Sequence, residues 1–297
     1  MVFLARLILK GPSQAALVAA TLAILGILLI PFIWLSGAAV GLVALVKDNR
    51  QTSLVIGMTA AGTTVFASLI FAAPSMVLYF LLAAWLPVWL AAYMLRTSTL
   101  AASLQLISGI SLLAIAGLYA FFPNMGEYWR EPMDLMAQQL YEQSQGQWSL
   151  EVLQDVKDLA IKMIPGLLVC SVLFGTMISL FLARWWQAVI FNPGGFGKEF
   201  KALNLGKTTA IFAMLIVVIV ALAGSELWYA MLLVVLALYT TQSVSILHAV
   251  FDGKRLNKVW LYLIYLVMFF SPEVAALMIL LGISDAWIDF RRRLITQ

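Results

Sequence analysis

The stretch from Ala183 to Ala210 carries the residue types whose spacing could support chemistry. It combines a tryptophan pair, a glycine-rich turn and three lysines. Its Gly206-Lys207-Thr208 sequence is typical of phosphate binding, but a P-loop requires another glycine five residues before Gly206. Lys201 stands there, and a strongly apolar segment follows at once. The turn at 194–197 is not a dinucleotide fingerprint either, because no βαβ pattern surrounds it. We therefore exclude nucleotide binding by these motifs.

The glycine-rich turn and its lysines have two other interpretations. Gly194, Gly195 and Gly197 would allow a tight turn with positive φ where the chain leaves a helix. Lys198 and Lys201 would then contact anionic lipid headgroups, each contributing about 1 kcal/mol near a membrane surface. In the second interpretation the same residues dock a cytoplasmic protein partner. The sequence leaves both open.

Reactive side chains are too sparse for catalysis or metal binding. The chain has one cysteine, Cys170, and one histidine, His248, so it offers neither an internal disulfide nor a Cys/His metal cluster. The few carboxylates near apolar segments lie at their ends, and none forms a set with a nucleophile and a base. We predict a protein that is not an enzyme and has no cofactor and no metal.

Composition places the chain in a membrane. Of its 297 residues, 63% are hydrophobic and 11% are charged, and the mean hydropathy is +0.99. Soluble domains carry roughly a quarter charged residues, whereas crossing a bilayer takes about 20 apolar residues. Apolar runs of that length recur, and backbone groups in lipid must bond internally. We therefore predict an all-α fold, a polytopic transmembrane helical bundle that forms a single domain over residues 1–297, with bilayer lipid as a partner.

About ten spans, arranged in hairpins, account for the apolar runs. Pro31 divides the first long run and Pro272 the last, because proline removes a backbone donor and breaks or kinks a helix. Some spans beside these prolines are short. The predicted spans are 14–30, 32–46, 52–73, 75–95, 99–122, 163–190, 208–224, 227–249 and the two halves of 259–290.

Basic residues fall almost entirely on one side of this arrangement. Fifteen of the eighteen lysines and arginines share the side of both termini and of a loop at 191–207. By the positive-inside rule this side is cytoplasmic, which predicts a multi-pass protein of the bacterial inner membrane. The same pattern explains the net charge of +4 without a nucleic-acid partner.

The polar segment 125–162 falls on the opposite side. It holds seven acidic and three basic residues, and its apolar residues are spaced as in two amphipathic helices. The glutamine-rich run 143–147 separates these helices and predicts a solvated loop. We expect the segment to be an extracytoplasmic insertion that lies on the membrane surface or covers a cavity.

Small residues indicate close helix contacts near the N-terminus. Ala15, Ala19 and Ala23 recur at every fourth position, and Gly37-x-x-x-Gly41 forms a second motif of this kind. Such faces let two helices approach until their backbones touch. The contact is either internal packing or docking of another subunit, which would be a different membrane protein or a second copy of the chain.

The Trp185-Trp186 pair, the NPGGFG segment at 192–197 and Glu199-Phe200 resemble the YybS-like family of bacterial membrane proteins. That family is distantly similar to the substrate-binding S components of energy-coupling-factor vitamin transporters. The resemblance implies that an alanine face on the first helix docks a transmembrane coupling subunit. Ala15, Ala19 and Ala23 would form that face here.

Two functions follow from these patterns. In the first, the chain binds or transports a small molecule in the manner of an S component, in a pocket that opens outward beneath the 125–162 segment. In the second, it is a membrane scaffold that recruits a protein partner through the 191–207 loop. The ligand contacts expected in the first case lie near outer span ends and are Asn124, Glu226, Trp228, Tyr229 and Glu273.

Overall fold

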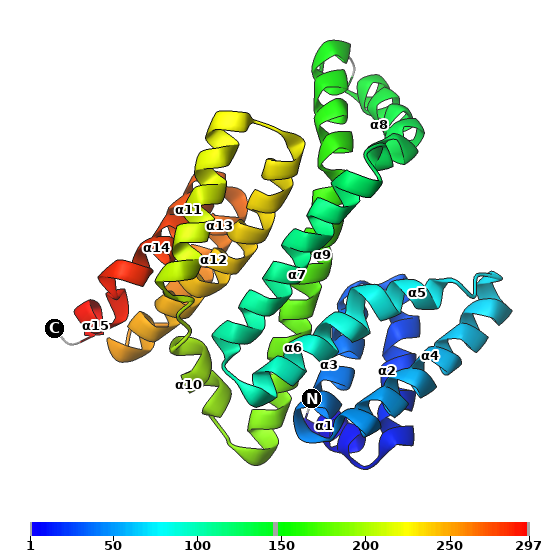
Figure 1. Cartoon of the computed structure of the whole chain (residues 1–297), viewed down its shortest axis with the longest axis vertical. Coiled ribbons are helices and arrows are strands. Elements are labelled where there is room, and N and C mark those ends of the chain that lie inside the picture. The colour runs from blue at the N-terminus through cyan, green and yellow to red at the C-terminus, as the bar shows by residue number, and fades with distance from the viewer. Residues whose placement is uncertain (1, 145–147, 296–297) are drawn as a thin grey trace. The chain divides into compact units, whose positions relative to one another are not determined.

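The computed structural model describes residues 2–144 and 148–295, and every regular element in these ranges is a helix, which confirms the all-α fold (Figure 1). The elements are α1 (Val2–Leu9), α2 (Pro12–Leu28), α3 (Pro31–Val46), α4 (Asn49–Phe71), α5 (Met76–Phe80), η1 (Leu81–Trp85), α6 (Leu86–Thr97), α7 (Leu100–Phe121), η2 (Met125–Trp129), α8 (Arg130–Gln143), α9 (Leu150–Phe191), α10 (Gly195–Lys201), α11 (Gly206–Ala223), α12 (Glu226–Gly253), α13 (Val259–Phe270), α14 (Pro272–Ile288) and α15 (Phe290–Ile295). η1 is a π-helical turn and η2 a 3₁₀ helix.

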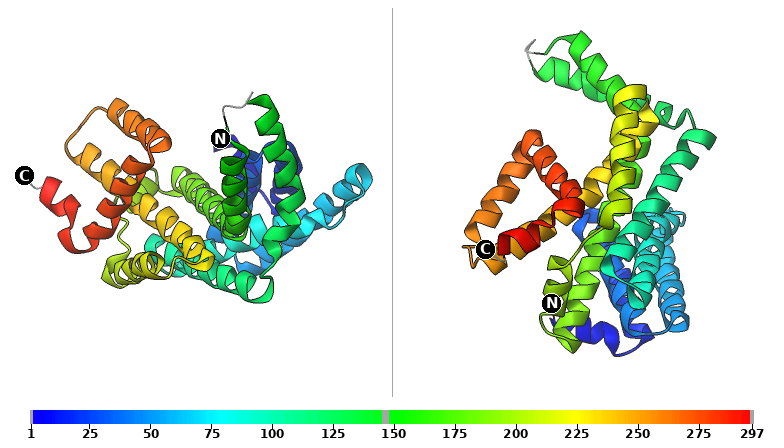
Figure 2. Two further views of the ribbon diagram at one scale, coloured as in Figure 1. Left: turned by 90° about the horizontal axis from the view of Figure 1, so that it is seen from above. Right: turned by 60° about the vertical axis from the view of Figure 1, so that its left-hand side comes forward.

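Six of the described helices are long and apolar enough to cross a membrane, as a multi-pass protein requires. They are α4, the continuous run Met76–Thr97, α7, α9, α11 and α12. α13 and α14 pass the same test as a pair but bend by 114°, which makes them either a seventh, broken span or a re-entrant hairpin (Figure 2). α2 and α3 are shorter apolar helices. The count of ten spans therefore stays a prediction.

Two prolines begin helices at the predicted breaks. Pro31 is the first residue of α3, and Pro272 is the first residue of α14. The first position of a helix needs no N–H donor, so proline is well suited to it. Ser271 caps α14, because its hydroxyl accepts a hydrogen bond from the Val274 amide at 3.5 Å.

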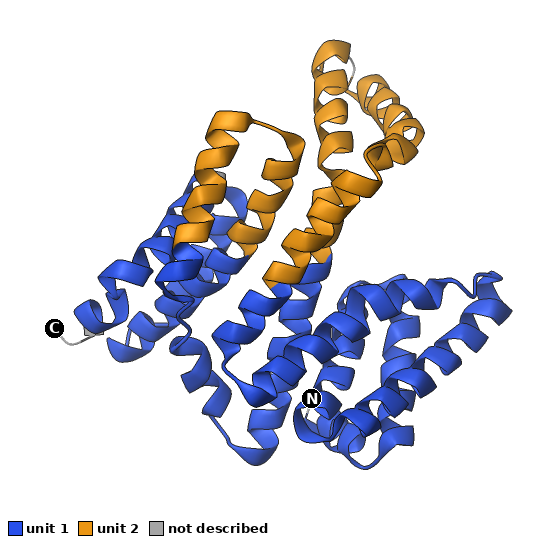
Figure 3. Ribbon diagram, viewed as in Figure 1, with its two compact units in different colours: residues 1–107, 172–210, 238–297 blue, residues 108–171, 211–237 orange. Residues whose placement is uncertain are grey.

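The chain forms two compact units, which we describe one at a time (Figure 3). Unit 1 comprises Met1–Ile107, Val172–Ala210 and Leu238–Gln297. Unit 2 comprises Ser108–Ser171 and Ile211–Ala237. The single transmembrane domain over residues 1–297 stays a prediction.

Within unit 1, small residues bring α3 close to α9. A Cβ placed on Gly37 would lie 2.7 Å from Ser179 Oγ, and one on Gly41 would lie 3.0 Å from the Ala183 Cβ. Ser179 also donates a hydrogen bond to the Trp34 carbonyl at 2.9 Å. The Gly37-x-x-x-Gly41 motif therefore faces a second motif with the same spacing, Ser179-x-x-x-Ala183, and the contact is internal packing.

The alanine face of α2 is also covered inside unit 1. Ala19 is fully buried, and its carbonyl accepts a hydrogen bond from Ser36 Oγ of α3 at 2.7 Å. Trp85 Nε1 of η1 donates to the same Ser36 hydroxyl at 3.0 Å. Ala15 and Ala23 are buried as well. In the described chain this face packs on its own neighbours, so the structure favours internal packing over subunit docking.

In unit 2, α8 lies beside the first turns of α9. Lys157 forms an ion pair with Asp134 at 2.7 Å, and Arg130 pairs with Asp158 at 3.5 Å. The first predicted amphipathic helix corresponds to α8. The second is not separate, because α9 runs for 42 residues through the expected start of the sixth span. Residues 145–147 of the predicted loop lie outside the described ranges.

Candidate functional site

The chain turns sharply between α9 and α10, at the NPGGFG segment. Gly194 has a φ of 83°, and the Gly195 amide donates to the Asn192 carbonyl at 2.9 Å. Positive φ is the region that favours glycine, so the predicted tight turn is present at Gly194. The expectation was wrong for Gly195 and Gly197, which lie inside α10 with ordinary helical backbone. The helix begins one residue after Gly194, so only that glycine has to turn the chain.

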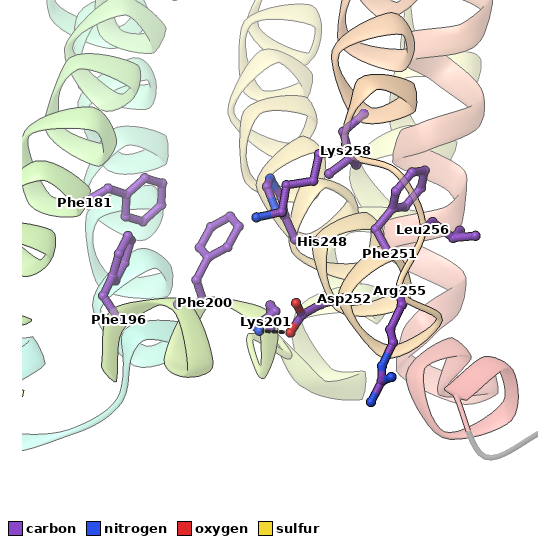
Figure 4. A pocket seen from close by; sticks show the side chains of 12 residues that line it. Phe181, Phe196, Phe200, Lys201, His248, Phe251, Asp252, Arg255, Leu256 and Lys258 are labelled. Atoms are coloured by element: carbon purple, nitrogen blue, oxygen red, sulfur yellow. Dashed lines mark hydrogen bonds and ion pairs between the residues drawn. The ribbon is translucent and has the colours of Figure 1, made fainter. Parts of the chain in front are cut away.

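A pocket of about 550 Å³ lies in unit 1 beside α10 (Figure 4). It is bounded by α9, α10, the end of α12 and the start of α13. Its lining residues are Phe181, Phe196, Gly197, Phe200, Lys201, His248, Phe251, Asp252, Arg255, Leu256, Lys258 and Leu261. The pocket therefore joins the NPGGFG segment to a second polar segment about fifty residues later in the chain.

Three phenylalanines form an aromatic wall on one side of this pocket. Ring centroids are 5.6 Å apart for Phe181 and Phe200, 5.9 Å for Phe196 and Phe200, and 6.0 Å for Phe181 and Phe196. The rings are tilted or edge-on to one another, which is a favourable aromatic arrangement. This wall offers apolar surface to a ligand.

The side formed by α12 and α13 carries charged residues together with Phe251 and Leu256 (Figure 4). Lys201 of α10 forms an ion pair with Asp252 of α12, and the side chains of Arg255 and Lys258 line the same pocket (Figure 4). Neither Arg255 nor Lys258 forms a salt bridge among the residues that the structure describes, although the charge of Lys258 acts on Asp252. The lining thus contains three cations and one carboxylate, and this excess of positive charge favours an anion.

Arg255 occupies a backbone position that glycine would fill more easily. Its φ is 52°, and α12 ends there with hydrogen bonds from the Arg255 amide to the Asp252 carbonyl and from the Leu256 amide to the Phe251 carbonyl. These two bonds form a Schellman motif, whose left-handed residue is usually glycine. A residue with a Cβ costs about 1–2 kcal/mol there. Ala72 and Asp289 adopt a similar φ, of 51° and 48°, at the ends of α4 and α14.

The segment that follows α10 is held by side chains of distant helices. Ser245 Oγ donates to the Phe200 carbonyl at 2.6 Å, and Gln242 Oε1 accepts from the Leu205 amide at 3.0 Å. Gln105 Nε2 donates to the Leu205 carbonyl at 2.8 Å. Because these bonds fix the backbone at 200–205, they also fix the orientation of α10 and its pocket side chains.

Arg291 completes this arrangement from α15. Its guanidinium donates to Asp285 Oδ2 at 2.7 Å, to the Leu203 carbonyl at 2.5 Å and to Ser245 Oγ at 3.0 Å. Asp285 is 1% exposed and also receives a hydrogen bond from Gln242 at 3.2 Å. Arg291 therefore links Asp285 of α14 to the backbone at residue 203.

The ligand contacts expected near the outer span ends are distributed over both units. Asn124, Glu226, Trp228 and Tyr229 belong to unit 2, and Glu273 belongs to unit 1. Glu226 forms an ion pair with Lys162 at 3.6 Å, and Glu273 accepts a hydrogen bond from Ser271 Oγ at 2.8 Å. A shared site for these five residues stays a prediction.

The two lysines predicted to contact headgroups have different surroundings. Lys198 is exposed on α10, whereas Lys201 is paired with Asp252 at the pocket. Sequence reasoning missed the other half of the pocket, at His248 and residues 251–258. The signal that could have found it is the charged run at 252–255.

Comparisons with known proteins give one match. A family model described as a predicted membrane protein, DUF2232, matches residues 14–286. Searches of curated proteins and of solved structures found no match.

Proposed function

Because the chain belongs to the DUF2232 family of predicted membrane proteins, we propose that this multi-pass membrane protein binds a small anionic molecule in the pocket between α10, α12 and α13. The observation that carries the proposal is the combination of three cations with one carboxylate beside a wall of three phenylalanines. Pockets that bind small molecules are mostly apolar and use a few placed polar groups for specificity. This pocket has that composition.

We place the pocket, both termini and the 191–207 segment on the cytoplasmic side of a bacterial inner membrane, and the 125–162 segment outside. The positive-inside rule supports this orientation, since fifteen of eighteen basic residues fall on the first side. A contact in unit 1 supports it too. Arg96 donates to the Lys47 carbonyl at 2.5 Å, so the basic ends of α3 and α6 meet as the proposed hairpins require.

The resemblance of the NPGGFG segment to the YybS-like family, itself distantly similar to S components, would imply the same general function, which is binding or transport of a small molecule. It places the ligand near the outer span ends and a coupling subunit on the alanine face. Ala19 is covered by α3, so a coupling subunit would have to dock elsewhere on the chain. We therefore keep the small-molecule hypothesis and assign the ligand to the pocket beside α10.

Native mass spectrometry of protein extracted in a neutral detergent tests the proposal. We expect a small anion bound to the wild-type chain and lost in Lys258→Glu, because that change reverses a charge at the pocket. Lys254→Glu is the matched control, since Lys254 is exposed and does not line the pocket. An adduct that survives Lys258→Glu, or no anion in the wild type, would contradict the proposal.

A scaffold that recruits a protein through the 191–207 segment is the second candidate. The exposed Lys198 favours it, as does the open space around Gly197, where an added Cβ would meet nothing within 4 Å. A partner docked on α10 would be lost in Lys198→Glu and kept in Lys258→Glu. Gentle affinity purification of both variants separates the candidates, because a stoichiometric protein with that pattern supports the scaffold alone.

A further inference from the structure

We infer that α13 and α14 form a re-entrant hairpin, which enters and leaves the membrane on the same side, and that Glu273 at its tip binds a proton there. The bend of 114° between the two helices is compatible with a broken span or with such a hairpin. The lengths of the helices, their ends and their contacts with α12 favour the hairpin. This site is separate from the anion pocket beside α10 and does not depend on it.

The first helix of the pair is too short to cross a bilayer. α13 has 12 residues, so it is about 18 Å long at a rise of 1.5 Å per residue. The hydrocarbon core of a bilayer is about 30 Å thick. A bend of more than 90° at Ser271 then turns α14 back toward the interface from which α13 started.

Both ends of the pair carry the residues of one membrane interface. Trp260 lies in the first turn of α13 and Trp287 in the last turn of α14, and both are exposed. Tryptophan is enriched where a membrane meets water. Beyond them stand Lys258 on one end and Arg291 on the other, and basic residues collect on the cytoplasmic side. The C-terminal end of the described chain also lies near the turn before α13 (Figures 1 and 2).

Both helices of the pair pack on the same part of α12. The Tyr265 hydroxyl of α13 and His248 Nε2 share a hydrogen bond at 2.8 Å. The Met278 carbonyl of α14 accepts a hydrogen bond from Ser243 Oγ. Positions 243 and 248 lie only about 8 Å apart along the axis of α12. A hairpin gives such a shared level, whereas the second half of a span would continue past it.

The tip of the hairpin lies among apolar, exposed side chains. Leu263 and Leu266 of α13 and Leu277 and Leu280 of α14 are all exposed, as is Phe270 next to the bend. Such surfaces are stable in hydrocarbon. Position 270 comes ten residues after the interfacial tryptophan of α13, which is about 15 Å along the helix. The tip therefore reaches the middle of a core that is about 30 Å thick.

Glu273 brings a carboxylate to this depth. Its side chain is exposed and accepts a hydrogen bond from Ser271 Oγ at 2.8 Å. Among the residues that the structure describes, it forms no salt bridge. An ionised carboxylate in hydrocarbon is costly unless a cation pairs with it, and otherwise it takes up a proton. One hydroxyl donor and the partial positive charge at the start of α14 do not replace a counter-ion.

Single cysteines at the two ends test the hairpin. In a Cys170→Ser background, Lys258→Cys and Arg293→Cys should react with an impermeant thiol reagent from the same side of the membrane. Both native residues are exposed, so a difference in labelling reports the side and not burial. Intact and opened cells are compared. If the two cysteines were labelled from opposite sides, α13 and α14 would form a span and the inference would be overturned.

Two carbodiimides test the proton on Glu273. Dicyclohexylcarbodiimide dissolves in lipid and reacts with protonated carboxyl groups, whereas a water-soluble carbodiimide with glycine ethyl ester modifies carboxyl groups in water. Both are applied to opened membranes, and peptide mass spectrometry locates the products. We expect Glu273 to be modified at least tenfold more by the first reagent. Glu142, which is exposed on α8, is the control and should show the reverse. Equal modification of both residues by the water-soluble reagent would overturn the proton site.

Two variants test the charge state by a separate measurement. Glu273→Gln keeps a neutral side chain of the same shape, so the melting temperature in lipid nanodiscs should stay that of the wild type. Glu273→Lys introduces a charge at the tip and should lower it. If Glu273→Gln lowered the melting temperature as much as Glu273→Lys, the fold would need the ionised carboxylate and the proton site would be wrong.

Discussion

Arg291 and Asp285 form an ion pair at 2.7 Å in which the carboxylate side chain has 0% and the guanidinium 14% exposed surface. The same guanidinium holds the Leu203 carbonyl at 2.5 Å. One residue near the end of the described chain thereby sets the backbone that follows α10. Neither residue lines the pocket beside α10.

Removing one partner of this pair should destabilise the protein strongly. Asp285→Leu leaves the Arg291 charge without its carboxylate, and breaking a buried pair costs about 3–5 kcal/mol. The double variant Asp285→Leu with Arg291→Met should recover part of that loss, because no unpaired charge remains. Thermal unfolding in detergent measures both. A single variant as stable as the wild type would mean that water reaches the pair.

Gly41→Val should destabilise the contact between α3 and α9. A Cβ at this position would lie 2.8 Å from Val88 and 3.0 Å from Ala183, so the helices must separate. Overpacking of this kind costs about 1–3 kcal/mol. The control is Gly57→Val, since a Cβ there meets nothing within 4 Å. Equal melting temperatures for the two variants would contradict the close approach.

Glycines of the NPGGFG segment should respond differently to substitution. Gly194→Val places a β-branched residue at a φ of 83°, which costs about 1–3 kcal/mol. Gly197→Ala should raise stability by up to about 1 kcal/mol, because Gly197 lies in α10 with open space around it. The melting temperature should therefore be lower for Gly194→Val than for Gly197→Ala. A lower melting temperature for Gly197→Ala would show that the turn is not centred on Gly194.

The proposed orientation predicts which single cysteines an impermeant thiol reagent reaches in intact cells. In a Cys170→Ser background, Glu142→Cys should be labelled from outside, and Lys198→Cys should be labelled only after the cells are opened. Both native residues are exposed, so access to the reagent depends on the side of the membrane and not on burial. If Lys198→Cys were labelled in intact cells and Glu142→Cys only after the cells are opened, the topology would be the reverse of the proposed one.

Local patterns in the sequence predicted much of the fold. Composition predicted the helices, Pro31 and Pro272 marked two breaks, and Gly37-x-x-x-Gly41 marked a close helix contact. The partner of that motif, Ser179-x-x-x-Ala183, lies more than 130 residues away, and no local pattern joins the two. The amphipathic pattern before residue 163 suggested a boundary that α9 does not have, because helical hydrogen bonds continue whether a turn lies in water or in lipid.

The pocket beside α10 is a second feature that local sequence patterns could not predict. Of the two segments that line it, the sequence singled out the one near residues 196–201 and not the one near 248–258. Their meeting depends on the tertiary contact between Lys201 and Asp252, which are 51 residues apart. A charge that marks a side of the membrane and a charge that binds a ligand look identical in a sequence.

The bond from Arg291 to the Leu203 carbonyl also constrains how the protein is made. The two residues are 88 positions apart, and ribosomes add about 5–20 residues per second, so roughly 4–18 seconds pass between their synthesis. During that interval the polar backbone after α10 has already been translated but cannot yet form this bond. A nascent chain arrested before residue 285 should therefore expose the 200–205 segment to proteases that the completed protein resists.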